Sequence, residues 1–245
     1  MKIEVWSDFV CPFCYIGKRR LEMALNQFPH KDQVEVEFKS FELDPNAPIQ
    51  TEQGIYQALA AKFGASEQQV REMNKGLIQL ASDLGITFNY EDMKPTNTFN
   101  AHRLNKFAKT IGKETELTEK LLHAYFTDTK NVGDIDTLAD LAESAGIDRS
   151  KALEVLNDET AFANEVRGDE RTAQQIGVTG VPFFVVNQKY SISGAQPQET
   201  FLGALTQIWE EEKPKPKFQE LRFDGDEGAI CTDDSCEVPS NSEKN

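Results

Sequence analysis

Residues 6–14 of the chain read WSDFVCPFC, which places Cys11 and Cys14 three positions apart behind a short strand pattern. Pro12 suits the first position of a helix, because the amide hydrogen that proline lacks has no partner there in any case. A sulfur at a helix N-terminus faces unpaired amide groups and the positive end of the helix dipole, and both favour the thiolate. The stretch therefore predicts an attacking thiol at Cys11 and, one turn along the same helix face, a resolving thiol at Cys14.

The surrounding pattern is that of a strand, a helix and a second strand. Residues 3–6 predict the first strand, the helix carries apolar residues on one face as far as Phe28, and residues 34–38 alternate as the second strand. Residues 1–50 thus form a strand–helix–strand unit that opens with the cysteine pair. In such a unit a Cys-x-x-Cys pair is more typical of redox chemistry than of a metal site.

Residues 51–160 predict consecutive helices with no convincing strand between them. Ser66 and Gln69 form a capping-box pattern at the start of one helix, and Thr98 suits the cap of another. This segment is expected to be a helical domain inserted into an α/β frame.

Residues 161–211 return to the α/β pattern. A helix is expected to end at Gly177, residues 183–192 predict a β-hairpin with its turn at Asn187 and Gln188, and a last helix begins near Pro197. Residues 212–245 follow as a polar, acidic tail.

The overall composition excludes several classes of protein. A formal net charge of −15 disfavours nucleic acid and anionic membrane surfaces as partners, because both are bound by clustered Lys and Arg. The sequence has no apolar stretch of about 20 residues that could cross a bilayer. Glu4 and Asp8 interrupt any apolar run that could serve as a signal-peptide core, so we expect a cytoplasmic protein.

Two motifs taken together indicate a family. Residues 6–14 followed by Gly17, and residues 180–184, which read GVPFF, resemble the DsbA-like thioredoxin superfamily, in particular its FrnE-like branch. That branch is similar to the hydroxychromene-carboxylate isomerases and the kappa-class glutathione transferases. The resemblance covers residues 1 to about 210. It implies an α/β thioredoxin fold with a large all-helical domain inserted between its two halves, plus the acidic C-terminal tail.

The resemblance also implies roles for residues outside the cysteine pair. Pro182 is expected to be a cis proline beside the cysteines, with the Val181 backbone pairing with the substrate chain. Pro12 and Phe13 are expected to contribute to substrate binding. We expect Trp6 and Phe13 to pack near the site.

A second segment is similar to one that borders the active site in the family. Residues 97–104 read NTFNAHRL, which makes Asn97, His102 and Arg103 candidate lining residues. The alternative is a capped amphipathic helix with a surface His and a surface Arg, and the pattern alone favours that alternative.

The other two cysteines, Cys231 and Cys236, form a tail pair among acidic residues. Nearby carboxylates disfavour their thiolates. Some FrnE-like proteins are similar in carrying a C-terminal Cys-x4-Cys, which implies an auxiliary redox pair that works with the active-site pair. The alternatives are an inert tail and a zinc site shared by the two cysteine pairs; we expect no metal.

The leading functional prediction is a thiol-disulfide oxidoreductase or isomerase that acts on protein thiols and needs no cofactor, with glutathione as an optional redox partner. One alternative is a glutathione-dependent isomerase or transferase on the same fold, although those relatives typically place Ser where Cys11 stands. Another is a non-enzymatic stress adaptor or metal-buffering protein. The sequence leaves the assembly open, with a homodimer as one option.

Overall fold

The computed structural model describes residues 1–213, 230–231 and 236–237, and its contacts divide the chain into two units, Met1–Trp209 and Glu210–Asn245. The first unit is built on a four-stranded mixed sheet with the strand order β2-β1-β3-β4. Strands β1 (Lys2–Ser7) and β2 (Glu35–Ser40) are parallel, whereas β3 (Phe183–Val186) runs antiparallel to β1 and pairs with β4 (Tyr190–Ser193) as a hairpin. The predicted strand–helix–strand unit and the hairpin are therefore both present.

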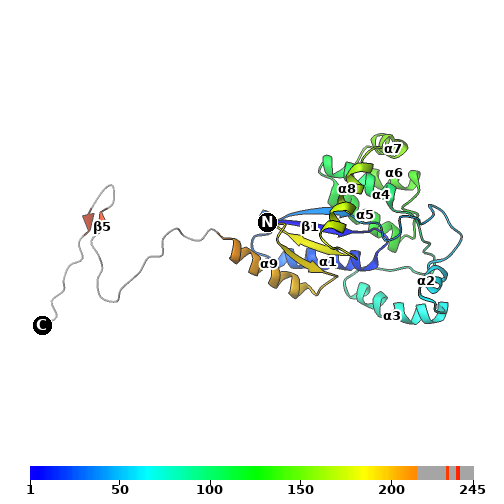
Figure 1. Ribbon diagram of the computed structural model, residues 1–245, viewed down its shortest axis with the longest axis horizontal. Helices are drawn as coiled ribbons and strands as arrows, with labels where there is room; N and C mark the ends of the chain where they lie inside the picture. The colour runs from blue at the N-terminus through cyan, green and yellow to red at the C-terminus, as the bar shows by residue number, and fades with distance from the viewer. Residues whose placement is uncertain (214–229, 232–235, 238–245) are drawn as a thin grey trace. The chain divides into compact units, whose positions relative to one another are not determined.

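One face of the sheet is closed by helices α1 (Pro12–Gln27) and α9 (Gln198–Glu212), as Figure 1 shows. Alternate strand residues point into this layer because side chains change sides at every residue of a strand. The buried residues of this core are Ile3, Val5, Leu21, Ala24, Phe28, Phe38, Phe184, Val186, Phe201, Leu205 and Ile208. They hold α1, and with it the cysteine pair, against the sheet.

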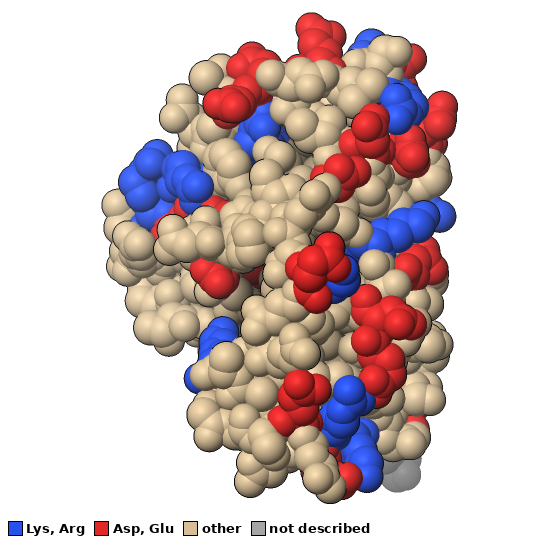
Figure 2. All heavy atoms as spheres, turned by 90° about the vertical axis from the view of Figure 1, so that its right-hand side faces the viewer, with Lys and Arg blue, Asp and Glu red and all other residues tan. Residues whose placement is uncertain are grey.

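The predicted helical segment lies between β2 and α8 (Ala163–Gln175) and has a larger core of its own. Its helices are α2 (Ile55–Phe63), α3 (Glu67–Asp83), α4 (Phe99–Thr110), α5 (Glu114–Phe126), α6 (Ile135–Ser144) and α7 (Arg149–Asn157). No helix of the described residues is long and apolar enough to cross a membrane. Figure 2 shows acidic and basic side chains intermingled over one face of the molecule.

Helix starts match the sequence prediction in one case and depart from it in another. At α3 both hydrogen bonds of the Ser66/Gln69 capping box are present. At α4, Thr98 occupies the cap position, but its side chain makes no capping hydrogen bond, and the Asn97 side chain instead accepts from the Phe99 amide at 2.9 Å. The predicted cap position is therefore confirmed, but the capping hydrogen bond expected from the Thr98 hydroxyl is absent.

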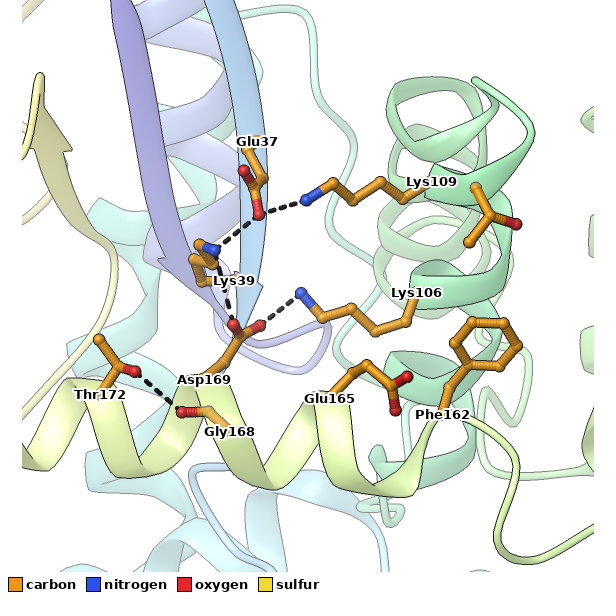
Figure 3. A pocket seen from close by; sticks show the side chains of 10 residues that line it. Glu37, Lys39, Lys106, Lys109, Phe162, Glu165, Gly168, Asp169 and Thr172 are labelled. Carbon is orange, nitrogen blue, oxygen red and sulfur yellow. Dashed lines mark hydrogen bonds and ion pairs between the residues drawn. The ribbon is translucent and has the colours of Figure 1, made fainter.

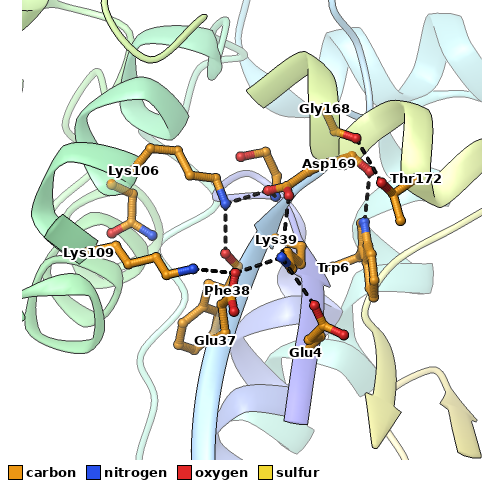
Figure 4. Close-up of polar contacts among 12 residues, drawn as sticks. Glu4, Trp6, Glu37, Phe38, Lys39, Lys106, Lys109, Gly168, Asp169 and Thr172 are labelled. Atoms are coloured by element: carbon orange, nitrogen blue, oxygen red, sulfur yellow. Dashed lines mark hydrogen bonds and ion pairs between the residues drawn. The ribbon is translucent and has the colours of Figure 1, made fainter. Parts of the chain in front are cut away.

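Polar side chains of the helical segment and of α8 dock onto the outer edge of β2. The Phe38 amide donates to Glu114 Oε2 at 3.2 Å, the Phe38 carbonyl accepts from Lys106 Nζ at 3.0 Å, and the Ser40 amide donates to Asp169 Oδ2 at 2.8 Å. An edge strand with free backbone groups invites pairing with another chain. Here side chains hydrogen-bond to the backbone groups of β2 and so join the helices to the sheet (Figure 4).

A hollow of about 550 Å³ lies beside this joint, between α4, α8 and β2 (Figure 3). The three lysines that line it are all paired with carboxylates: Lys39 and Lys109 with Glu37, and Lys106 with Asp169. Burial alone would raise the pKa of Glu37, but hydrogen bonds from lysines outweigh it and lower that pKa. We read the hollow as part of the polar joint.

The hairpin turns where the sequence predicts, at Asn187 and Gln188, whose φ angles are 51° and 55°. Two consecutive positive φ angles are typical of a turn whose twist matches that of the flanking strands. In the second unit, β5 (Ile230–Cys231) pairs antiparallel with β6 (Cys236–Glu237), and the two cysteines are register partners. The rest of the predicted tail lies outside the described residues.

Candidate active site

Both cysteines of the first pair lie at the start of α1, as predicted. Cys11 is the N-cap residue, with an extended backbone, and Pro12 begins the helix. The Cys11 amide donates to Asp8 O at 3.2 Å and the Cys14 amide donates to Cys11 O at 3.0 Å, so a tight turn delivers the chain from β1 into the helix. Both sulfurs are free thiols and both residues are buried.

The loop before β3 meets the first sulfur. Cys11 Sγ lies 3.6 Å from the carbonyl oxygen of Val181, and the Val181–Pro182 peptide bond is cis, as the resemblance implies. Residues 170 positions apart in the chain are thereby brought into contact.

Gly17 makes this approach possible. A Cβ at position 17 would lie 2.9 Å from Pro182 Cγ and 3.3 Å from Phe184 Cζ. The first distance is shorter than a normal contact between carbon atoms, so the proline ring would have to move. The glycine therefore lets α1 pack directly on the proline loop, one turn beyond Cys14.

The two thiols have different surroundings. Burial raises the pKa of the Cys14 thiol well above its ordinary value, and hydrogen bonding and charge at Cys11 raise it further. The Ser7 hydroxyl and the Asp8 backbone act against this by hydrogen bonding to the Cys14 sulfur. Cys14 is therefore held as a protonated thiol, which needs a base before it can attack a disulfide.

Asp8 is a site residue that the sequence interpretation missed. Its side chain is completely buried, accepting from the Leu43 amide at 2.7 Å and lying 3.3 Å from His102 Nε2. The available signal was its place in the turn, three residues before Cys11. His102 also packs on the ring of Phe9, with ring centres 4.7 Å apart. It is buried, so the surface-histidine alternative was wrong for this residue.

Arg103 and Asn97 make contacts of another kind. Arg103 is buried, and its guanidinium donates to the backbone oxygens of Val155, Asp158 and Ala161, which fixes the connection between α7 and α8. The Asn97 amide group donates to Pro45 O at 3.2 Å. The contacts described for these two residues are thus structural. The predicted surface position of Arg103 was wrong.

The two aromatic candidates differ. Trp6 is buried in β1, donates from Nε1 to Asp169 O at 3.1 Å and packs on Ala173 and Val178. Phe13, by contrast, lies between the two cysteines in the first turn of α1 and is 48% exposed, so it stands at the site without being part of the core. The first turn of α1 directs this side chain outward beside Cys11.

The described residues contain no group of three or more His, Cys, Asp or Glu side chains placed to hold a metal ion. The tail pair's side chains, on which the shared zinc alternative depends, lie outside that part of the structure.

Comparisons with known proteins agree with this geometry. A family model described as a DSBA-like thioredoxin domain matches residues 2–206. The uncharacterized protein YwbO of Bacillus subtilis is 31% identical over 215 residues, covering 87% of this chain and 98% of that protein. The crystal structure of the probable DsbA oxidoreductase SCO1869 of Streptomyces coelicolor matches with a TM-score of 0.83 and 41% identity, covering 98% of this chain and 100% of that one.

A more distant match concerns the alternative function. The structure of a 2-hydroxychromene-2-carboxylate isomerase matches with a TM-score of 0.63 and 14% identity, over 86% of this chain and 97% of that one. At this identity the likeness extends to the fold alone. The predicted fold class, a thioredoxin fold with a helical insertion, is confirmed.

Proposed function

Because the chain belongs to the DSBA-like thioredoxin domain family, we propose that it is a thiol-disulfide oxidoreductase or isomerase acting on protein thiols. The observation that carries the proposal is the unequal pair at the start of α1. Cys11 sits at the helix N-terminus, 3.6 Å from the Val181 carbonyl oxygen, while Cys14 is buried behind it with a raised pKa.

The proposed reaction follows from this difference between Cys11 and Cys14. The Cys11 thiolate attacks a substrate disulfide, which releases one substrate sulfur and leaves the other bonded to Cys11. Cys14 then attacks Cys11, a disulfide forms between the two cysteines, and the substrate leaves as a dithiol. If a different thiol of the substrate attacks the substrate sulfur bonded to Cys11 first, a new substrate disulfide forms, Cys11 leaves as a thiolate and the enzyme pair stays reduced, which is isomerisation.

Two features support a protein substrate at this site. The exposed ring of Phe13 offers apolar contact directly beside the attacking sulfur. The backbone of Val181 lies alongside Cys11, where an extended peptide could pair with it. We place the activity in the cytosol because four cysteines in 245 residues suit a reducing compartment, with glutathione as a redox partner.

The test uses a protein with scrambled disulfides as substrate and the Cys11→Ser and Cys14→Ser variants. We expect Cys11→Ser to abolish reduction and isomerisation, and Cys14→Ser to accumulate a mixed disulfide at Cys11 that mass spectrometry detects. The control replaces both tail-pair cysteines by serine. Turnover retained in Cys11→Ser but lost in the tail variant would overturn the assignment.

A further inference from the structure

A small polar cavity lies between β1, β2 and α4. Its volume is about 10 Å³, and its polar lining comes from Ser7, Lys39, Ser40, Asn105 and His102. That volume matches about one water-sized probe, and a buried water needs two to four polar partners. The cavity is therefore suited to hold a single water molecule between β1 and α4.

Ser7 connects this cavity to the resolving cysteine. Ser7 lines the cavity, and hydrogen bonding by its side chain lowers the pKa of the Cys14 thiol. A hydroxyl both donates and accepts, so it can pass a proton from one side to the other. His102 lies on the far side of the cavity.

Asp8 orients the His102 ring, because Asp8 Oδ1 and His102 Nε2 lie 3.3 Å apart. When Asp8 is a carboxylate it only accepts, so the ring donates from Nε2 and Nδ1 is the nitrogen left to take up a proton. A nucleophile, a base and a group that orients the base are thereby arranged in order, with Ser7 between the first two.

The other charged groups around His102 are compatible with a transient imidazolium. Glu42 interacts with His102 electrostatically; its side chain is 1% exposed, and Oε1 has no hydrogen-bond partner among the described residues. Its other oxygen pairs with Arg167. Lys39 also borders the cavity but is paired with Glu37. Two carboxylates thus interact with the ring, and the neighbouring cations have partners.

We propose that His102 accepts the proton that Cys14 loses when it resolves the mixed disulfide, through Ser7 and the cavity behind it. The inference rests on the proposed function. In this step the bond between Cys11 and the substrate sulfur breaks and the Cys11–Cys14 bond forms. The electron pair leaves with the substrate sulfur, which takes a proton from solvent, and the Cys14 proton moves to His102.

The experiment uses the aromatic disulfide 5,5′-dithiobis(2-nitrobenzoate), in a chain whose tail pair is replaced by serine. Attack by Cys11 releases one coloured thiolate at a rate that depends on reagent concentration. Resolution by Cys14 releases a second at a rate that does not. The two steps are therefore seen separately in one stopped-flow trace.

In His102→Gln we expect the second phase to slow by about 10²-fold, the lower end of what a positioned base contributes, while the first phase is unchanged. In the parent chain, where the tail pair alone is replaced, the rate of the second phase should reach a plateau with rising pH, whereas in His102→Gln it keeps rising. Ser7→Ala should slow the same phase, and it decides alone if His102→Gln does not fold. The control is His123→Gln, whose side chain is half exposed on α5.

An unchanged second phase in either folded variant overturns the inference, as does equal slowing of both phases, because that would reflect a distorted site. Release of only one thiolate by the parent chain, in which the tail pair alone is replaced, contradicts the proposed function itself. The two failures are therefore distinguishable.

Discussion

Glu114→Gln should change how the stability of the protein depends on pH. Glu114 is buried at the joint between α5 and β2, where one carboxylate oxygen accepts from the Phe38 amide and the other has no partner among the described residues. Burial raises the pKa of this carboxyl from 4.5 to about 7, against the hydrogen bond from Phe38 and the charges of Lys106 and Lys109.

The sign and size of this pH effect on stability follow from the linkage between proton binding and folding. A carboxyl whose pKa is higher in the folded state stabilises that state below the unfolded pKa, and the contribution is lost as pH rises through the folded pKa. At about 1.4 kcal/mol per pH unit, a rise from 4.5 to about 7 corresponds to a loss of up to ~3 kcal/mol by pH 8. Glutamine keeps an oxygen for the Phe38 amide and cannot ionise, so the variant should escape this loss.

The assay is urea unfolding of the wild type and Glu114→Gln at pH 5 and pH 8. We expect the two proteins to differ little at pH 5 and the variant to be more stable by up to ~3 kcal/mol at pH 8. Glu116→Gln, at an exposed position on the same helix, is the control and should leave the pH dependence as in the wild type. A stability difference that stays constant between the two pH values, or moves the other way, would refute the reasoning.

Three further predictions concern the thiols and their support. At neutral pH Cys11 should alkylate at least about tenfold faster than Cys14, because the raised pKa of Cys14 keeps it a protonated thiol; mass spectrometry after limited alkylation measures this, and equal rates contradict it. Gly17→Ala should lose about 1–3 kcal/mol and slow the first thiolate release, because its Cβ must displace Pro182, whereas Gly76→Ala, with open space around it, should gain about 0.5–1 kcal/mol. When the active-site pair is oxidised and the tail pair is reduced, the Cys11 thiol of the wild-type chain should recover at a rate that does not depend on protein concentration. The Cys231→Ser/Cys236→Ser chain should lack this recovery. Identical recovery of the Cys11 thiol in both chains would make the tail a passive appendage.

Much of the fold could be predicted because it depends on neighbours in the chain. The Ser66/Gln69 capping box, the turn at Asn187 and the proline start of α1 are all local arrangements, whose energies come from backbone groups within a few residues. Thr98 takes the predicted cap position without its hydrogen bond, because the adjacent Asn97 side chain accepts from the Phe99 amide.

The site required contacts between distant segments, and residue type alone does not reveal those. Asp8 and His102 lie 94 positions apart in the chain and form a pair. Cys11 and Val181 are in contact although 170 positions separate them. An arginine next to that histidine on α4 turns instead to the oxygens of residues 155–161. Successive residues of a helix face different directions, so only the packing of neighbours decides which of them reaches a site.

The sequence by itself determined the chemistry of this protein: two thiols spaced by one helical turn, the first at a helix N-terminus, which sets an attacking and a resolving sulfur. Only the tertiary structure decided the environment of that chemistry. Burial raises the pKa of Cys14, Gly17 admits the proline loop, and Asp8 and His102 meet behind the pair. The reason is that dielectric surroundings and proton acceptors arise from the packing of segments far apart in the chain, which no local pattern encodes.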